Sequence, residues 1–514
     1  MEQKLHPVLS VRLFTDEKCF GPGVAALLTL VKTCHSLRAA AMEMGMAYSK
    51  AWTILKNAEE QLGFKLLLST TGGNSAINGG QYAAYTSKRA ADLQQKLGLE
   101  PDTAEKHIED TIKGGDNMSN PALVREMVYA SPVYFDLLLD NGLQIRDTLA
   151  RPGGHYGYRT YVTENQVGSD ITNLQLKMLK ETSATIELET KMVEIYRTRD
   201  EANRVVGIRV ATADGYKTIE AKKGVIMATG GFSSNVEMRE TQVPYLTADL
   251  PTTNIKAAST GEGIYLAQAI GANTTQMSNI QRYPWADPNT GVLDKYAVWP
   301  FTGPSYGVIY VDYNGNRYVN EGDRRDVCAN AAVNTGFVST YAIFTEPVVA
   351  GYVRPEEIEA GIADGRILKA DTLDELAEKI NGFEVKGLYP TVTGENLKAT
   401  IEKHNGYIDN GEDLDFGKVM ASTMVKIEDG PYYALPQFPS VHHTMGGLVI
   451  DTMTRVIDIY GQPIDGLYAA GEVTGGVHGT NRLGSNADAD ACGFGYISGI
   501  VVSTGELPDF IPAE

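Results

Sequence analysis

Two histidines stand side by side in the string VHHTMGG, although the chain holds only eight histidines. Adjacent side chains in a strand point to opposite faces, so His442 and His443 are expected to face different neighbours. Arginine and imidazole side chains can both bind an anion such as a carboxylate. Arg482 stands in the string NRLGSN.

Two strands are predicted to end in glycine-rich turns. Residues 224–228 (GVIMA) have the pattern of a buried strand and run into Thr229-Gly230-Gly231, and residues 466–473 (GLYAAGEV) repeat this pattern. The carboxyl ends of strands are where open α/β sheets bind ligands. The string NRLGSN then opens a helix whose free amide groups can face an anionic or carbonyl group.

Helices and strands alternate along the rest of the chain, which is typical of an α/β fold. Hydrophobic periodicity predicts helices near 83–97, 103–114, 120–141 and 170–182, and strands near 184–197 and 204–212.

These motifs, together with GGNSAINGGQYAA at 72–84, resemble the flavoprotein subunits of the fumarate reductase/succinate dehydrogenase superfamily, most of all its soluble fumarate and urocanate reductase-like branch. The resemblance implies an α/β FAD-binding domain in two parts, 72–278 and 444–514. It also implies an α+β capping domain at 279–443 that closes over the substrate, and reduction of the C=C bond of an α,β-unsaturated carboxylate.

The resemblance assigns the FAD contacts residue by residue. They are Asn74, Ser75, Gly79, Gly80, Val193, Glu262, His443, Glu472, Ala487 and Asp488. Glycine lets the backbone approach a ring system closely, and a carboxylate at a strand end can accept hydrogen bonds from ribityl hydroxyls. For Glu262 the alternative is a surface charge at a helix start, where it favours the helix dipole.

The resemblance also assigns the reacting groups. In the motif RYVNEGDRRD at 317–326 the family's proton donor falls on Arg325. Arginine normally stays protonated, so acid catalysis requires a dry, cation-rich site. The alternative is a surface ion pair between Arg325 and Asp326. His442 and Arg482 match carboxylate-binding positions, and Tyr283 is also placed in the catalytic group. The substrate contacts are Gly80, Tyr283, His442, Arg482 and Ser485.

Three departures from the family pattern argue against fumarate as the substrate. Tyr283 stands in place of a substrate histidine, the polar pair for a second carboxylate aligns with Pro300 and Phe301, and a relay arginine aligns with Pro304. An apolar wall cannot pair with a second carboxylate, because burying an unpaired charge is costly. We therefore expect a mono-carboxylate enoate such as urocanate or an aryl acrylate. The group that returns a proton to Arg325 stays open.

The family begins with a strand, a GxGxxG turn and a helix that seat the ADP diphosphate, and the sequence has no such unit before GGNS. Residues 21–26 (GPGVAA) match the fingerprint formally, but no buried strand precedes them and no acidic strand end follows, so we interpret the match as false. We expect exposed apolar sheet surface, and FAD binding that is weakened or rescued by a partner.

Residues 1–71 are predicted to form a small winged helix-turn-helix domain, with helices at 23–33, 36–45 and 49–62. The strings MGMAYSKAW and NAEEQLGF resemble the DNA-binding domain of molybdate-responsive (ModE-type) regulators, with a truncated wing. Phosphates or base edges would be contacted by Tyr48, Ser49, Lys50 and Lys56. The alternative is a three-helix bundle that packs or dimerises without DNA.

Composition narrows the class of protein. The 514 residues are 43% hydrophobic and 21% charged, which is typical of a soluble multi-domain protein. The net charge is -19, but residues 1–73 hold eight Lys/Arg and six Asp/Glu, so the remainder carries -21 and would repel a polyanion. The four cysteines lack CxxC and CxxCH spacing, which argues against a disulfide scaffold, a zinc or iron-sulfur site and attached haem.

The chain has no export signal and no run of 18 apolar residues, so we expect a cytoplasmic protein with no membrane span and no metal. With neither a haem motif nor a nicotinamide fingerprint, electrons would come from an external donor. Three hypotheses stay open: an FAD-dependent enoate reductase, a DNA-binding regulator with a ligand- or redox-sensing flavoprotein-like body, and an inactive fused remnant.

Overall fold

The computed structural model describes residues 73–511 except 256–257, 337–338 and 384–388, together with isolated positions before residue 73. The chain divides into two compact units. One comprises Met1–Thr70 and Pro355–Ile367, and the other comprises Thr71–Arg354 and Leu368–Glu514.

In the first unit, strands β1 (Leu13–Phe14) and β2 (Lys18–Phe20) pair antiparallel, and α14 (Pro355–Ala363) is a helix. Helical backbone is also found at Leu27, Glu43, Lys50, Ala51 and Thr53, within the three stretches predicted as helices. The other elements of the predicted winged helix-turn-helix, with Tyr48, Ser49 and Lys56, lie outside the described residues. DNA binding therefore stays a prediction.

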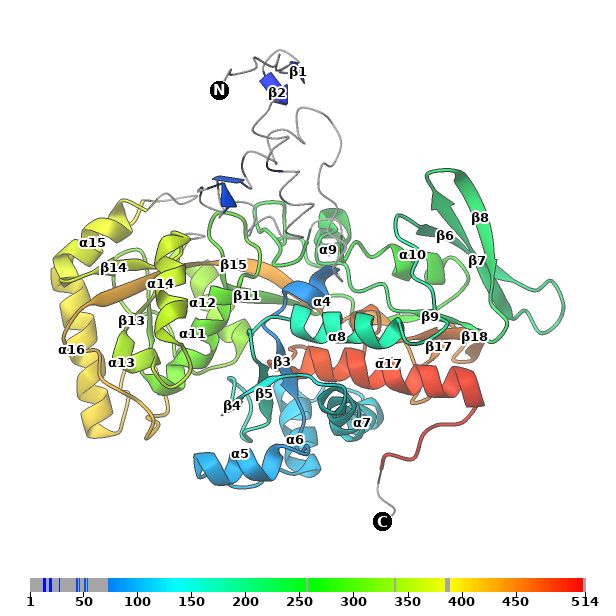
Figure 1. The fold of residues 1–514 in the computed structure, drawn as a ribbon, viewed down its shortest axis with the longest axis horizontal. Coiled ribbons are helices and arrows are strands. Elements are labelled where there is room, and N and C mark those ends of the chain that lie inside the picture. The colour runs from blue at the N-terminus through cyan, green and yellow to red at the C-terminus, as the bar shows by residue number, and fades with distance from the viewer. Residues whose placement is uncertain are drawn as a thin grey trace, which may run out of the picture. The chain divides into compact units, whose positions relative to one another are not determined.

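The second unit contains three small sheets (Figure 1). In the first, β9 (Val225–Met227) pairs in parallel with β18 (Pro463–Ala469), which pairs antiparallel with β17 (Arg455–Ile457). The second has the order β3 (Gln81–Ala83), β5 (Thr160–Thr163), β4 (Ile145–Ala150). The third is a meander of β6 (Lys191–Arg197), β7 (Val205–Thr212) and β8 (Gly215–Glu220). Two further short strands, β10 (Thr274–Thr275) and β16 (Gly447–Leu448), pair with each other.

The largest sheet is formed by residues between 280 and 444. Its strands lie in the order β11 (Ile280–Ala286), β15 (Tyr432–Thr444), β13 (Thr340–Thr345), β12 (Ile309–Val311), and β14 (Leu368–Ala370) also pairs with β15. In the register of β11 and β15, Tyr283 lies opposite Ser440 and Gln281 lies opposite His443. The predicted boundary at 443/444 therefore falls within the last two residues of one continuous strand.

Helices connect and cover these sheets. They are α4 (Gly73–Ile77), α5 (Ala90–Leu97), α6 (Ala104–Gly114), α7 (Pro121–Asp140), α8 (Ser169–Leu179), α9 (Val236–Gln242), α10 (Glu262–Gln268), α11 (Val298–Thr302), α12 (Arg325–Asn334), α13 (Glu346–Val349), α15 (Leu373–Asn381), α16 (Gly394–Asn410) and α17 (Asn486–Thr504), with short 3-10 turns at Lys295–Ala297, Gly303–Tyr306 and Gly471–Val473. Helix α7 starts where predicted because Asn120 caps it, its side chain accepting from the amide of Ala122, and Pro121 occupies its first turn.

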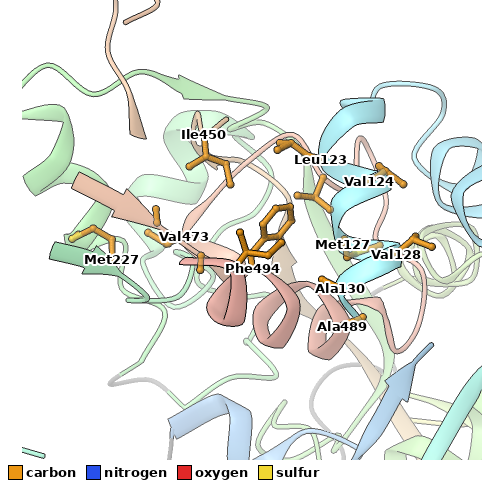
Figure 2. Close-up of a cluster of buried hydrophobic side chains, with 14 of the residues drawn as sticks. Leu123, Val124, Met127, Val128, Ala130, Met227, Ile450, Val473, Ala489 and Phe494 are labelled. Atoms are coloured by element: carbon orange, nitrogen blue, oxygen red, sulfur yellow. The ribbon is translucent and has the colours of Figure 1, made fainter. Parts of the chain in front are cut away.

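The core of the second unit lies between α7 and α17 (Figure 2). Phe494 of α17 is buried with Met127 and Val473. Helix α7 also lies close to Gly493 of α17, because a Cβ built on Gly493 would lie 3.4 Å from the Cβ of Ala130. Burying each large apolar side chain contributes about 1.5–3 kcal/mol. This packing fixes the start of α17, the helix that follows NRLGSN.

Two sequence predictions were wrong in part. The helix expected at 83–97 begins only at Ala90, because residues 81–83 form β3 and their side chains are buried against the neighbouring strand β5. The strand expected at 184–197 begins only at Lys191. Residues 184–190 have no strand partner among the described residues, so their backbone has no ladder to join. The helices predicted near 103–114, 120–141 and 170–182 and the strand near 204–212 are confirmed.

Strand β9 is the end strand of its sheet in the described part of the chain. Its residue Ile226 is 39% exposed, and Ile186 and Leu188 in the extended segment before β6 are also exposed. Apolar side chains at a sheet edge are normally covered. The expected gap in the sheet stays a prediction, because most residues before 73 lie outside the described part of the chain.

Among the residues that the structure describes, no helix has the length and apolar character needed to cross a bilayer.

Candidate active site

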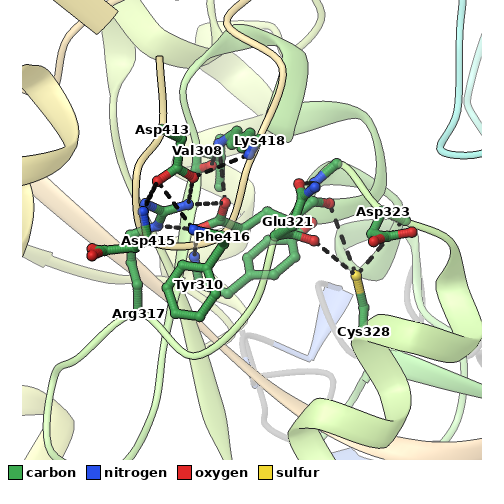
Figure 3. Close-up of polar contacts among 12 residues, drawn as sticks. Val308, Tyr310, Arg317, Glu321, Asp323, Cys328, Asp413, Asp415, Phe416 and Lys418 are labelled. Atoms are coloured by element: carbon green, nitrogen blue, oxygen red, sulfur yellow. Dashed lines mark hydrogen bonds and ion pairs between the residues drawn. The ribbon is translucent and has the colours of Figure 1, made fainter. Parts of the chain in front are cut away.

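Arg325 is the first residue of α12 and is buried. The loop before it is held by a buried ionic network (Figure 3). Arg317 donates from Nε to Glu321 at 2.7 Å and from Nη2 to Asp413 at 2.8 Å, and Lys418 Nζ lies 3.3 Å from Glu321. Glu321 also accepts from the amide of Tyr310 in β12 at 3.2 Å. The network anchors the loop to the large sheet, and so fixes where Arg325 enters the site.

Burial alone would raise the pKa of Glu321, but Lys418 and Arg317 lower it below its ordinary value. The carboxylate is thus charged in the folded chain, and its charge is compensated on two sides. A buried pair of this kind is strongly destabilising when one partner is removed.

Arg325 lies among aromatic rings. Its Cζ is 5.0 Å from the ring centre of Tyr283 and 4.7 Å from that of Phe301. Trp285 extends this wall, with its ring 5.2 Å from Tyr283 and 5.6 Å from Phe301. The guanidinium is thus buried among aromatic rings, and acid chemistry by an arginine would require such a site to exclude water.

His442 and Arg482 contact each other directly. The Nη2 of Arg482 lies 2.7 Å from Nε2 of His442, and Nδ1 of His442 lies 2.7 Å from Oγ1 of Thr253. A guanidinium can only donate, so Nε2 accepts and the imidazole proton sits on Nδ1, where it is donated to Thr253. The ring of Tyr283 lies 4.8 Å from that of His442, which joins this pair to Arg325. In this arrangement the imidazole orients Arg482, whereas the sequence predicted it as a donor to the substrate.

Both arginines keep one buried N–H group without a partner. The Nε atoms of Arg325 and Arg482 have no hydrogen-bond acceptor among the described residues. Burial, and then the neighbouring Arg482, lower the pKa of Arg325 to about 9, and burial lowers that of Arg482 to about 10. Burial and Arg482 likewise hold the pKa of His442 well below its ordinary value, so the imidazole is neutral. Two unpartnered guanidinium donors are suited to an anion.

Gln281 is a site residue that sequence reasoning missed. Its Oε1 accepts from Arg325 at 3.3 Å, and its Nε2 donates to Asn481 at 2.6 Å and to the carbonyl of Arg482 at 2.8 Å. It therefore links the two arginines. Gln281 stands two residues before Tyr283, and the two-residue period of a strand places both on one face, so this signal was present in the sequence.

A buried cluster around Arg159 contacts the loop that carries Arg482. This arginine donates to Asp102 at 2.6 Å and to Asp110 at 2.5 Å, and its Nη1 lies 3.1 Å from Nδ1 of His155. Since Arg159 can only donate, Nδ1 accepts and the His155 proton sits on Nε2, which donates to the carbonyl of Gly484 at 2.9 Å. Burial and then Arg159 lower the pKa of His155 to about 3, so the ring is neutral.

Ser485 ends this loop in a left-handed conformation, with φ of 63°. Its hydroxyl lies 2.6 Å from that of Thr160 in β5. The hydroxyl of Ser485 is thus engaged by the protein in this structure, and its predicted substrate contact is not tested.

Several residues assigned to FAD come together at the start of α17. Asn78 donates to Asp488 at 3.0 Å and accepts from the amide of Gly80 at 2.8 Å. Gly80 has φ of +57°, and a side chain there would collide with Thr163 and Val167. Ser75 and Asp488 line a cavity of about 480 Å³ that runs along α17. Ala487 precedes Asp488 in the same helix turn.

A second group surrounds Glu472, just after β18. Its Oε1 accepts from the amide of Thr444 at 2.9 Å and lies 3.7 Å from Nδ1 of His443. A side chain at Gly231, in the turn after β9, would collide with Thr444 and Glu472, so only glycine lets that turn approach. Burial raises the pKa of Glu472 to about 7 and that of Asp488 to about 7.

The other residues assigned to FAD lie outside these two groups. Val193 lies in β6, and Glu262 begins α10, where it is exposed and ion-pairs with Lys191 at 2.5 Å. This is the surface alternative considered for Glu262. Asn74 lies in α4 and Gly79 just after it.

These residues fit the ring end of FAD. Glycine backbones approach closely at Gly80 and Gly231, and the buried carboxyl groups of Glu472 and Asp488 can donate or accept according to their protonation. In the part of the chain that the structure describes, no strand, turn and helix stand beside β9 to hold a diphosphate.

Comparison with known proteins indicates the family of this chain. Residues 67–487 match the family model described as FAD binding domain. The chain is 35% identical over 436 residues to an NADH:fumarate oxidoreductase of Klebsiella pneumoniae, covering 84% of this chain and 44% of that protein. It is 34% identical over 442 residues to the urocanate reductase of Eggerthella lenta, covering 84% of this chain and 69% of that protein.

Among solved structures, the open conformation of a flavocytochrome c3 fumarate reductase matches with a TM-score of 0.63 and 31% identity, covering 84% of this chain and 72% of that one. The chain spans less than half the length of the Klebsiella relative. The family match covers most of the chain and indicates FAD as the cofactor. The chain belongs to the FAD binding domain family, with relatives among the fumarate and urocanate reductases.

Proposed function

We propose that this protein is an FAD-dependent oxidoreductase that reduces the C=C bond of an α,β-unsaturated mono-carboxylate, with a urocanate- or aryl acrylate-like rather than a fumarate-like substrate. The observation that carries the proposal is that the buried Nε groups of Arg325 and Arg482 both lack a hydrogen-bond partner in the described part of the chain. The names of the Klebsiella and Eggerthella relatives support it, because both are reductases of unsaturated acids.

In this proposal Arg482 binds the substrate carboxylate. His442 fixes the guanidinium by accepting one of its N–H groups, and Thr253 fixes the His442 tautomer. The positive charge so placed withdraws electron density from the double bond next to the carboxylate, which favours attack at the carbon further away.

Arg325 donates the proton to the carbon next to the carboxylate. Its pKa of about 9 makes it a stronger acid than an ordinary arginine, although it stays protonated at neutral pH. Gln281 holds the guanidinium from one side, and Tyr283 and Phe301 hold it from two faces. Bound FAD supplies the hydride, with electrons from an external donor.

The aromatic wall supports a ring-bearing substrate. Tyr283, Trp285 and Phe301 are all buried, and an apolar wall favours an uncharged aromatic group over a second carboxylate. Each proposed domain has its own role. Residues 72–278 and 444–514 bind FAD, and residues 279–443 cap the substrate. Residues 1–71 form a separate small domain.

The proposal is tested by the Arg325→Ala variant. We expect it to keep the flavin absorption spectrum of the parent chain and to lose alkene reduction. Arg282→Ala is the matched control, because Arg282 alternates with Gln281 and Tyr283 on β11 and contacts Tyr245 instead. Retained turnover in Arg325→Ala would refute its assignment as the acid.

A further inference from the structure

Two buried polar groups near the proposed substrate site have no partner. Trp285 is 2% exposed and Ser440 is 0% exposed, yet neither Nε1 of Trp285 nor Oγ of Ser440 has a hydrogen-bond partner among the described residues. Leaving a buried donor unsatisfied is costly, and native proteins rarely do so without a bound group to fill the gap.

Both groups flank the ring of Tyr283. Ser440 lies directly opposite Tyr283 in the pairing of β15 with β11, so the two side chains leave the sheet on the same face as neighbours. Trp285 stands two residues along the strand from Tyr283, and their rings meet edge to face at 5.2 Å. Tyr283 in turn lies against both Arg325 and His442. The residues that carry the two unpartnered groups are thus neighbours of Tyr283 in the wall of the site.

The chemistry of these groups limits what they bind. An indole N–H only donates, so Trp285 needs an acceptor, while a serine hydroxyl can donate or accept. The nearby hydroxyl of Tyr310 is already used, since it donates to the carbonyl of Pro300 at 2.5 Å. Both unpartnered groups are neutral, so they suit a neutral acceptor better than a second carboxylate.

We propose that Trp285 and Ser440 hydrogen-bond an acceptor atom on the ring of an aryl enoate, and so select heteroaromatic or oxygen-bearing rings over plain hydrocarbon rings. This inference rests on the proposed function, because it takes the carboxylate of the same ligand at Arg482. Trp285 and Ser440 determine specificity and have no part in the chemical step.

The test is calorimetric binding to the full chain with its bound flavin, at pH 8. The ligands are cinnamate and the three positional isomers of 3-pyridylacrylate, which match cinnamate in shape but carry one neutral ring nitrogen. We expect at least one isomer to bind the parent chain about five- to a hundredfold more tightly than cinnamate.

Trp285→Phe keeps an aromatic ring but removes the N–H group. We expect it to abolish most of the preference for the pyridyl isomer, measured as the ratio of pyridyl to cinnamate affinity in the same variant, so that a loss of ring packing shared by both ligands cancels. Ser440→Ala should reduce the same preference. The control is Trp299→Phe, the same change at another buried tryptophan, which should keep the preference.

Equal weakening of all four ligands by Trp285→Phe, or a parent chain that does not distinguish any pyridyl isomer from cinnamate, would overturn the inference and leave the proposed function standing. A flavin-loaded parent chain that neither binds nor reduces any of the four acids would instead overturn the proposed function, and this inference with it.

Discussion

Replacing Glu472 by glutamine is expected to stabilise the flavin-free chain at alkaline pH. Glutamine keeps an oxygen that can accept from the amide of Thr444 but removes the buried charge. Burial raises the pKa of Glu472 from 4.5 to about 7, and at about 1.4 kcal/mol per pKa unit this amounts to about 3 kcal/mol. The side chain is 18% exposed, so solvent screening makes this figure an upper limit.

The sign follows from proton binding. Between pH 4.5 and about 7 the folded chain keeps the Glu472 proton that the unfolded chain has lost, so this group makes stability fall as pH rises through that window and adds no further change above it. The Glu472→Gln variant lacks this pH-dependent loss of stability. We expect urea unfolding to give similar free energies for Glu472→Gln and the parent at pH 4.5, and a more stable variant at pH 8, by up to about 3 kcal/mol.

Glu378→Gln, at an exposed position of α15, is the control and should follow the parent at both pH values. Other titrating groups, such as Asp488, affect parent and variant alike, so the difference between the two curves isolates Glu472. A difference that is the same at pH 4.5 and pH 8, or a variant that is less stable at pH 8, would show that Glu472 is not held in a desolvated site.

Three further changes test other parts of the account. Glu321→Gln removes the buried negative charge that faces Arg317 and Lys418, so we expect a loss of about 3–5 kcal/mol in urea unfolding, and a loss below 1 kcal/mol would contradict the network. His155→Ala removes the ring that joins Arg159 to the carbonyl of Gly484, and leaves that carbonyl with the hydroxyl of Ser485 as its donor. We expect a loss of about 1–3 kcal/mol and weaker carboxylate binding, and unchanged binding would show that the loop is held without His155. For the predicted DNA-binding domain, Lys50→Ala should weaken duplex binding and flatten its salt dependence, measured by fluorescence anisotropy, and binding that is absent or independent of salt in the parent chain would exclude this role.

Sequence motifs predicted many residues of the candidate site. Arg325, Tyr283, His442 and Arg482 are far apart in the sequence, and the structure gathers them as the family resemblance implied. These positions were predictable because each lies in or beside a distinctive string of the sequence.

The supporting residues were not predictable in the same way. Thr253 and His155 act through contacts made only by tertiary packing, and no periodicity or motif marks them. The segment 184–190 has strand-like residues but no partner strand among those that the structure describes, so propensity alone predicted the wrong state. Gln281 is the intermediate case, since its strand position carried a signal that was overlooked.

In the proposed function this chain holds an unsaturated acid against a flavin and reduces it. An anaerobic experiment tests this: the flavin-loaded chain is reduced with dithionite and mixed with urocanate or cinnamate while flavin absorbance is followed. We expect oxidised flavin to return together with an equal amount of the saturated acid. A flavin that stays reduced with both acids, yet reoxidises when oxygen is admitted, would contradict it.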